Sequence, residues 1–339
     1  MASPGGGISA IAEFYRDRCI LITGATGFMG KIRSIFLLMR PKRGQDVRTR
    51  LNELLNAQLF DGLRREHPEA LGKLIPVAGD IMQPELGISP ADQRTLMEHV
   101  SVVFHSAATV KFDEALKLSQ SAGLPVAIVR PSIVTAAWKE PLPGWVDNLN
   151  GPTGMIAGAG KGVLRTLLCY RDFVADLVPV DVCINLMVSV AWHTATARPN
   201  DIIVYNCTSG CLNPIRWHDV EKLGYEFLLK NPCSDVLWYP AGSFKSSRLV
   251  NSFCVIAFHL APALIPTIPS MMRIQEKLQR AVACLEFFTT HEWRFTNENV
   301  IRLADRLSPR DRRLFNFDIR ELDWREYIEK YVLGVRKYI

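Results

Sequence analysis

The sequence lacks the patterns that mark several common classes of protein. Its eight cysteines form no C-x-x-C pair and most lie in apolar runs, which favours reduced, buried thiols in an intracellular protein. Cys207 and Cys211 could ligate a metal, but no second pair or histidine cluster completes a zinc site, so no metal is expected.

The 40 lysines and arginines form no dense cluster, so nucleic-acid binding is not indicated. The net charge of +6 would suit an anionic ligand or a solvated surface.

The sequence also has no apolar signal region at its N-terminus, so a secretory signal is not predicted. Its most apolar stretch, Phe253 to Ile268, has 16 residues and is broken by two prolines. A helix that spans a bilayer needs about 20 apolar residues, so a buried or interfacial segment is favoured. The chain ends at Ile339 without an apolar tail, and we therefore expect a soluble or weakly membrane-associated protein.

What the sequence does contain is an alternation of strand-like and helix-like segments. Strands are expected over residues 18–24, 34–39, 73–81, 100–104, 124–134 and 201–210, and helices over 46–71, 89–100 and 213–231. A further helix is expected within 176–196, beginning after Pro179-Val180-Asp181. This alternation predicts an α/β fold with a parallel sheet covered on both faces. After about residue 235 the period is helical. We predict a flexible N-terminus over 1–17, a Rossmann-like reductase domain over 18–235 and a helical C-terminal domain over 236–339.

Residues 138–162 are rich in Gly, Pro and Asn and are predicted to form a loop that walls a substrate pocket. They contain the run "GAGKG", which resembles a phosphate-binding loop. Gly162 follows Lys161 where a Walker loop has Ser or Thr, and Met155 stands where its first glycine belongs. A nucleoside triphosphate site is therefore not predicted.

The first strand runs into Gly24-x-x-Gly27-x-x-Gly30, the pattern with which a dinucleotide pyrophosphate approaches the backbone. A crossover helix should follow. Instead, only Lys31, Ile32 and Arg33 separate Gly30 from the next strand. Three residues span about 10 Å, whereas a parallel connection usually needs about a dozen residues. We therefore predict that the first two strands are not adjacent parallel partners joined in the usual right-handed way, and that apolar surface is exposed beside the connection.

Several separated motifs occur in one order along the chain. They read "LITGATGFMGK", "LLMRPKRGQ", "FHSAATVKFDEALKLS", "VAIVRPSIVTAAWKEPLPGWVDN", "GAGKGVLRT", "ADLVPVDV", "TSGCLNP" and "FNFDIRELDWREYIEKYVLGVRKY". Together they closely resemble the animal alcohol-forming fatty acyl-CoA reductases of the extended short-chain dehydrogenase/reductase superfamily. The resemblance runs from about Ile11 to Ile339 and includes the helical C-terminal domain of that family.

The resemblance implies an oxidoreductase of lipid biosynthesis that uses NADPH to reduce long-chain fatty acyl-CoA to fatty alcohol. It also implies a location on the peroxisomal membrane, or in the cytosol for a chain without the family's apolar tail. The implied cofactor-binding residues are Gly24, Thr26, Gly27, Gly30, Arg40, Lys42, Asp80, Ala107 and Ala108. The glycines would face the pyrophosphate, Arg40 and Lys42 the 2′-phosphate, Asp80 the adenine, and the two alanines the nicotinamide ribose.

The resemblance also shows what this chain is missing. Relatives have a helix after the glycine motif, and a long segment after Ser119 that carries an active-site Ser and a helix with Tyr-x-x-x-Lys. No Tyr-x-x-x-Lys occurs here, since Tyr225 is five residues before Lys230 and Tyr327 is three before Lys330. Structural roles are favoured for both tyrosines, and no catalytic residue is assigned. An active reductase, an inactive truncated relative and an incomplete gene model all remain open, as does the oligomeric state.

Overall fold

The computed structural model of the chain describes residues 8–23, 32–41, 44–106, 123–234, 236–240, 242–261 and 271–339. The chain divides into two compact units. Unit 1 comprises Met1–Val126, Ala191–Asn200 and Leu307–Leu314, and unit 2 comprises Ala127–Val190, Asp201–Arg306 and Phe315–Ile339. The domain boundary expected between residues 235 and 236 divides the chain differently and stays a prediction.

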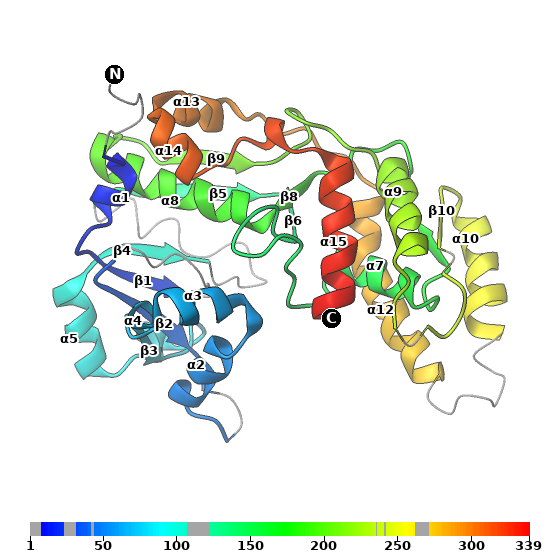
Figure 1. The fold of residues 1–339 in the computed structure, drawn as a ribbon, viewed down its shortest axis with the longest axis horizontal. Helices are drawn as coiled ribbons and strands as arrows, with labels where there is room; N and C mark the ends of the chain where they lie inside the picture. Colours follow the sequence, from blue (N-terminus) through cyan, green and yellow to red (C-terminus); the bar gives the residue numbers. More distant parts are fainter. Residues whose placement is uncertain are drawn as a thin grey trace. The chain divides into compact units, whose positions relative to one another are not determined.

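Unit 1 is built on a parallel sheet of four strands in the order β3-β2-β1-β4, drawn in blue to cyan in Figure 1. The strands are β1 (Cys19–Thr23), β2 (Ser34–Met39), β3 (Leu74–Ala78) and β4 (Val100–His105). Cys19, Leu21, Phe36 and Val77 of the strands form a core cluster with Ile88 and Leu96, which come from the segment between β3 and β4. The predicted Rossmann-type parallel sheet is confirmed, because apolar runs of this kind are buried in a parallel sheet.

The pairing of β1 with β2 contradicts the prediction that these strands are not adjacent. They lie side by side and parallel, with Leu21 opposite Phe36. The connection comprises ten residues, 24–33, and not only the three after Gly30. Ten extended residues reach about 33 Å, and the return along a five-residue strand needs only roughly 16 Å. Length alone therefore permits the pairing without a helix. Residues 24–31 lie outside the described part of the chain, and Ile32 is buried rather than part of an exposed apolar surface.

The helices of unit 1 are α1 (Ala10–Phe14), α2 (Val47–Leu55), α3 (Asp61–Glu66), α4 (Pro68–Leu71), α5 (Pro90–His99) and α14 (Pro309–Leu314), with 3₁₀ turns at Gln58–Phe60 and Pro84–Gly87. The single helix expected over residues 46–71 is thus divided into shorter pieces. The segment expected to be flexible is structured from Ile8 onward. Ser9 caps α1 by accepting the Ala12 N–H at 3.0 Å, and Ile11 and Tyr15 are buried.

Unit 2 contains three pairs of parallel strands. They are β5 (Ala127–Pro131) with β9 (Ile203–Cys207), β6 (Ile133–Thr135) with β8 (Leu177–Pro179), and β7 (Thr166–Leu168) with β10 (Ser243–Lys245). The pair formed by β7 and β10 shows that strand pairing continues beyond residue 235, where the sequence pattern predicts only helices. A buried cluster that includes Leu164, Leu167, Leu177 and Trp217 forms the core of this unit.

The helices assigned to unit 2, in whole or in part, are α7 (Pro152–Gly160), α8 (Val180–Ala197), α9 (Trp217–Lys230), α10 (Arg248–Val255), α12 (Met271–Thr289), α13 (Glu298–Arg306) and α15 (Trp324–Tyr338). A π-helical turn, η3 (Ile256–Leu260), continues α10, and a 3₁₀ turn, η4 (Ile319–Glu321), precedes α15. Helix α7 lies inside the segment predicted to be loop. Its small residues serve packing, because a Cβ at Gly160 would lie 2.8 Å from Leu228 Cδ2 and from Cys233 Sγ.

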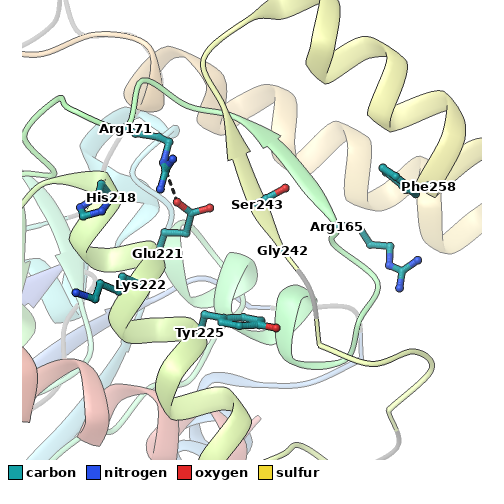
Figure 2. Close-up of a pocket in the computed structure, with 9 residues that line it drawn as sticks. All are labelled: Arg165, Arg171, His218, Glu221, Lys222, Tyr225, Gly242, Ser243 and Phe258. Atoms are coloured by element: carbon teal, nitrogen blue, oxygen red, sulfur yellow. Dashed lines mark ion pairs between the residues drawn. The ribbon is translucent and has the colours of Figure 1, made fainter.

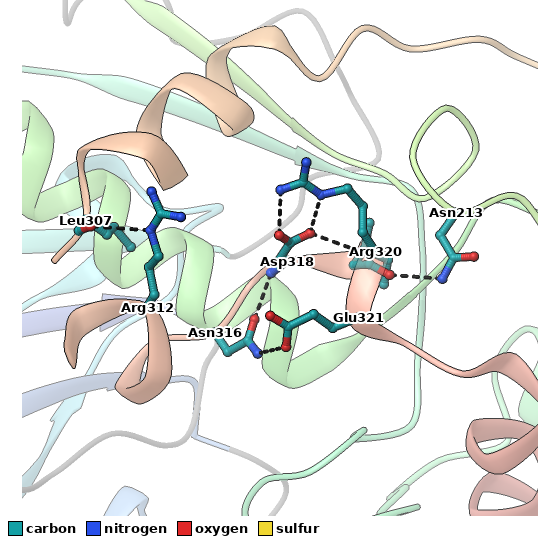
Figure 3. Close-up of polar contacts among 8 residues, drawn as sticks. Asn213, Leu307, Arg312, Asn316, Asp318, Arg320 and Glu321 are labelled. Atoms are coloured by element: carbon teal, nitrogen blue, oxygen red, sulfur yellow. Dashed lines mark hydrogen bonds and ion pairs between the residues drawn. The ribbon is translucent and has the colours of Figure 1, made fainter. Parts of the chain in front are cut away.

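Helix α15 is anchored by polar contacts as well as by its apolar side chains. Asn213 donates to the Ile319 carbonyl at 3.0 Å (Figure 3), and Trp324 Nε1 donates to the Asn213 carbonyl at 3.0 Å. Further along the helix, the Tyr327 hydroxyl donates to the Ala136 carbonyl at 2.8 Å. These contacts fix the C-terminal helix to the end of β6, so the last residues of the sequence form part of the core of unit 2.

Figure 3 also shows the turn that leads into α15. The Arg320 guanidinium makes two hydrogen bonds, of 2.7 and 2.6 Å, to the Asp318 carboxylate, and Asn316 Nδ2 donates to Glu321 at 2.8 Å. Both contacts are local and exposed, so their role is to hold the shape of the turn.

Among the described residues, α8 is the helix long and apolar enough to cross a membrane, but half of that stretch is buried, as in a core helix.

Candidate functional site

Two of the nine residues assigned to the cofactor, Arg40 and Asp80, lie in the described part of unit 1. Arg40 follows β2 and Asp80 follows β3, so both stand at the carboxyl end of the sheet. Arg40 Nη1 lies 3.8 Å from Asp80 Oδ2. The Arg40 side chain is 72% exposed, so its guanidinium remains open to an anionic ligand. The structure thus brings together two side chains that the sequence separates by 40 positions.

The backbone around Asp80 is closely fitted to its neighbours. A Cβ at Gly79 would lie 2.5 Å from Leu38 Cδ1 and 2.6 Å from the Leu86 carbonyl oxygen, so only glycine fits there. The Asp80 N–H donates to the Leu86 carbonyl at 2.7 Å, and its carboxylate accepts the Met82 N–H at 3.0 Å. The position of the carboxylate is therefore set by the turn that follows β3.

A second polar pair lies at the ends of β1 and β4. Thr23 Oγ1 lies 3.0 Å from His105 Nδ1, and the Ser106 hydroxyl donates to the Thr23 carbonyl at 3.0 Å. The strand order places β4 on one side of β1 and β2 on the other, and a ligand crevice is expected where the winding of a parallel sheet reverses. The other assigned residues lie outside the described part of the chain; they are Gly24, Thr26, Gly27, Gly30, Lys42, Ala107 and Ala108.

Unit 2 contains an apolar cavity of about 1080 Å³. Its wall is formed mainly by residues 149–164, which include α7, by α12 and by the residues after α12. The lining includes Met155, Leu164, Trp217, Leu285, Phe287 and Trp293. Small-molecule sites commonly measure roughly 300–1,000 Å³ and are mostly apolar, so this cavity is large enough for a long aliphatic ligand. The predicted role of residues 138–162 as a pocket wall fits Leu149 to Leu164, part of which forms this cavity as helix α7.

A small polar group stands in the wall of this cavity. The Asp176 carboxylate accepts the Ser132 hydroxyl at 2.8 Å and the Ser209 N–H at 2.7 Å, which joins the bend after β5 to the end of β9. The sequence analysis did not single out Asp176. Its place in "VADLVP", just before a buried strand, could have indicated a polar residue at a strand end. Because Ser132 already donates to a carboxylate, its hydroxyl is held in place rather than free to react.

A second cavity of unit 2, of about 540 Å³, is lined by basic and polar side chains (Figure 2). Arg171 Nε lies 3.0 Å from Glu221 Oε2, which neutralises the carboxylate. Arg165 and Lys222 also line the cavity, and within the described ranges neither has a carboxylate within ion-pair distance. Figure 2 draws Arg165 and Lys222 on opposite sides of the cavity, so each offers a single positive charge at its rim to an anionic group such as a phosphate.

A narrow apolar slot of about 60 Å³ borders both cavities. It shares Met155 and Leu164 with the apolar cavity, and Glu221, Tyr225 and Ser243 with the basic cavity. The slot thus shares wall residues with the basic cavity and with the apolar cavity, so the three spaces are neighbours within unit 2. Such an arrangement suits an amphiphile that has an anionic head and an aliphatic tail.

The tyrosines divide into buried and accessible groups. Tyr327 and Tyr331 are buried, and burial raises the pKa of each phenol above its ordinary value. Burial likewise raises the pKa of Tyr15 and of Tyr205. None of these four is suited to donate a proton to a ligand. Tyr225, on α9, is 36% exposed and lines the basic cavity, where Figure 2 shows its ring beside the cleft.

Cys207, which the sequence places four residues before Cys211, has Cys183 as its neighbour in space. Cys207 Sγ lies 3.5 Å from Cys183 Sγ, and Cys211 is exposed. Across the described residues, no group of three or more His, Cys, Asp or Glu side chains is placed to hold a metal ion.

Comparison with known proteins places these features in a family. Two sequence models described as male sterility protein match the chain, an NAD-binding model over residues 22–119 and 116–187 and a second model over residues 252–339. Fatty acyl-CoA reductase 1 of Xenopus laevis is 34% identical to this chain over an alignment that covers 97% of it and 86% of the relative. The human protein of the same name is 32% identical with the same coverage. The chain belongs to the fatty acyl-CoA reductase family.

Solved structures agree on the fold. A reductase domain of a nonribosomal peptide synthetase from Mycobacterium tuberculosis aligns with a TM-score of 0.64 at 17% identity, covering 94% of this chain and 92% of that one. The terminal reductase domain of the myxalamid pathway aligns with a TM-score of 0.62, also at 17% identity, covering 94% of this chain and 91% of that one. At this identity the likeness establishes the fold, while the NAD-binding sequence model supports a nicotinamide cofactor for the family.

The comparisons also locate residues that relatives have and this chain does not. The alignment with the Xenopus relative is 443 positions long, whereas this chain has 339 residues, so at least 104 positions have no counterpart here. The match to the NAD-binding model breaks into two stretches that overlap at residues 116–119. That break coincides with the place after Ser119 where the sequence pattern indicates a missing segment. The fatty acyl-CoA reductase resemblance is thus confirmed together with a large internal gap.

Proposed function

We propose that this chain binds fatty acyl-CoA in unit 2, and that it is a member of its family in which reduction of the acyl group to an alcohol is severely impaired. The observation that supports binding most strongly is the series of basic cavity, apolar slot and apolar cavity. A fatty acyl-CoA has phosphates at one end and an aliphatic chain at the other, which matches this order.

In this proposal the acyl chain occupies the apolar cavity. Aliphatic carbons there would contact Met155, Leu164 and Leu285, and burial of each methylene contributes about 0.8 kcal/mol. The phosphates would contact Arg165 and Lys222, where charge-assisted hydrogen bonds are available. The Arg171–Glu221 ion pair would shape the rim without adding net charge.

The described residues also fit a nicotinamide dinucleotide at the end of the sheet in unit 1. Gly79 removes a Cβ beside the turn after β3, and Arg40 presents an exposed guanidinium within 3.8 Å of Asp80. A cation in that position after the second strand suits the 2′-phosphate of NADPH, so we propose NADPH rather than NADH. When bound, this cofactor would supply the hydride for carbonyl reduction.

Reduction also needs an acid at the carbonyl oxygen, and this chain contains no Tyr-x-x-x-Lys. The four most buried tyrosines have raised pKa values and sit in hydrogen-bonded or apolar surroundings, which supports a structural role for them. The second candidate function is full reduction of fatty acyl-CoA to fatty alcohol with a replacement acid. Membership of the family favours it, and Tyr225, which is partly exposed and lines the basic cavity, is the tyrosine we propose for that role.

The binding proposal can be tested by calorimetry with palmitoyl-CoA and palmitate. Arg165→Gln should weaken palmitoyl-CoA binding about tenfold, because one charged hydrogen bond to phosphate is lost, and leave palmitate binding unchanged. Arg302→Gln is a matched control, since Arg302 is exposed on α13 and lines neither cavity. Equal affinities of parent and Arg165→Gln for palmitoyl-CoA would contradict the assignment of the basic cavity.

A further inference from the structure

Helix α10 and its continuation η3 present apolar side chains on both faces. On the inner face, Cys254 and His259 are buried. On the outer face, large apolar side chains are exposed to solvent to the following extents: Leu249 84%, Val250 49%, Phe253 70%, Ile256 59% and Phe258 46%. The outer face of an ordinary surface helix is polar, so this face, from Leu249 to Phe258, needs a covering partner.

The helix cannot bury this face by rotating, because its inner face is held by polar contacts. His259 Nε2 accepts the backbone N–H groups of Arg165 and Thr166 at 3.1 and 3.3 Å. Thr166 Oγ1 donates to Asn251 Oδ1 at 2.9 Å, and Arg248 Nη2 lies 2.7 Å from Glu286 Oε1. Any rotation would leave the buried His259 ring and the N–H groups of Arg165 and Thr166 without their partners, which is costly. The apolar face therefore stays directed outward.

The charge of the surrounding sequence indicates the chemistry of the partner. The 40 residues from Val236 to Gln275 contain no Asp or Glu, but they contain Lys245, Arg248 and Arg273. The basic cavity adjoins the same face, since Phe258 lines that cavity together with Arg165 (Figure 2). A surface that is apolar, has cations beside it and lies in a stretch of sequence without Asp or Glu is complementary to anionic lipid headgroups above an acyl layer.

We propose that the outer face of α10 and η3 docks on the surface of a lipid bilayer that contains anionic lipids. The helical stretch Arg248–Leu260 is about 20 Å long, too short to cross a hydrocarbon core of about 30 Å but suited to lying in the interface. Leu249, Phe253 and Ile256 enter the acyl boundary, and Lys245 contacts the headgroups. This inference does not depend on the proposed function, although it would bring the basic cavity next to a source of lipid ligands.

The test uses the full chain and sedimentation with vesicles of phosphatidylcholine, with or without phosphatidylserine. The parent should bind vesicles that contain phosphatidylserine more strongly than vesicles of phosphatidylcholine alone. The double variant Leu249→Ser, Phe253→Ser should lose binding roughly tenfold or more, because two large apolar contacts are removed. Both side chains are exposed, so the substitutions break no internal contact. Met82→Ser, Met97→Ser is the matched control, since these methionines are equally exposed in unit 1.

Lys245→Gln provides a second, independent arm that alters no apolar contact. It should weaken binding to vesicles with phosphatidylserine about fivefold and leave binding to phosphatidylcholine unchanged. The proposal is overturned if the parent binds neither vesicle, or if the double variant binds as the parent does. It is also overturned if light scattering shows a dimer that the double variant dissociates, because the face would then be covered by a second copy of the chain.

Discussion

Strands β1 and β4 are hydrogen-bonded neighbours in one parallel sheet, but only β1 is enclosed. In β1, Cys19, Ile20, Leu21 and Thr23 are buried. In β4, half-buried and exposed positions alternate, no residue is fully buried, and Val103 is 58% exposed. Both sequences are apolar runs that predict burial on both faces. The apolar pattern of a strand therefore predicts that it should be buried. Whether it is buried depends on other segments of the chain that pack against its faces.

The same contrast recurs between two helices of unit 2. Helix α15 buries Tyr327, Ile328 and Tyr331 and satisfies both hydroxyls, whereas α10 leaves its outer apolar face uncovered. In unit 1, strand β4 ends 14 residues before Ser119, where the match to the NAD-binding model breaks. The missing segment offers a physical reason for the exposure of β4, which the first two predictions below test.

The largest expected effect concerns catalysis. Residues 1–339 supplied with NADPH and palmitoyl-CoA should form fatty alcohol at least about 10²-fold more slowly than the Xenopus relative, because general acid catalysis contributes roughly 10²–10⁴-fold. The measurement is alcohol formed per enzyme per minute. Inserting the relative's unmatched segment after Ser119 should restore turnover and protect Val103 from solvent. Turnover equal to that of the relative in the uninserted chain would refute the prediction and make Tyr225 the first residue to mutate.

The next effect compares the same substitution on a buried and an exposed strand position. Val77 of β3 is 4% exposed and belongs to the cluster that contains Leu21, whereas Val103 of β4 is 58% exposed. Val77→Ala should lower the free energy of unfolding by about 1.5–3 kcal/mol. Val103→Ala should change it by less than about 0.5 kcal/mol. Urea unfolding measures both, and equal losses would mean that β4 is covered in solution.

A smaller effect is expected at the anchored helix. Tyr331→Phe removes the partner of Thr153 Oγ1, which lies 2.6 Å from the tyrosine hydroxyl in a buried site, so unfolding free energy should fall by about 1–2 kcal/mol. Tyr338→Phe, on the same helix, is the control, because Tyr338 is partly exposed and packs its ring against Trp145. If the two variants are equally stable, the Tyr331 hydroxyl does not help to hold α15.

The smallest effect is a pH dependence at the inner face of α10. Burial holds the pKa of His259 below its ordinary value of 6.5, and the neutral ring accepts two backbone N–H groups. The unfolded chain takes up the proton at higher pH than the folded chain. The contribution of His259 to the free energy of unfolding is therefore fully present above about pH 6.5, and it is lost as the pH falls through the lowered pKa. His259→Gln should flatten this part of the curve of unfolding free energy against pH, and a curve parallel to that of the parent would count against it.

The sequence by itself determined the parallel sheet, the positions of most strands, the family and the absence of a Tyr-x-x-x-Lys pair, because these depend on local apolar period and on motifs that are contiguous in the chain. It also placed Arg40 and Asp80 at strand ends, which parallel pairing brings together. It did not reveal helix α7, because glycines that normally signal a loop serve close packing here, nor the pairing of β1 with β2 across ten residues. The basic and apolar cavities, the hydrogen bonds of Asp176 and the outward direction of the α10 face were decided only by the tertiary structure. Each of these features joins residues that are far apart in the sequence. A local sequence pattern cannot predict which apolar face will be covered by another segment.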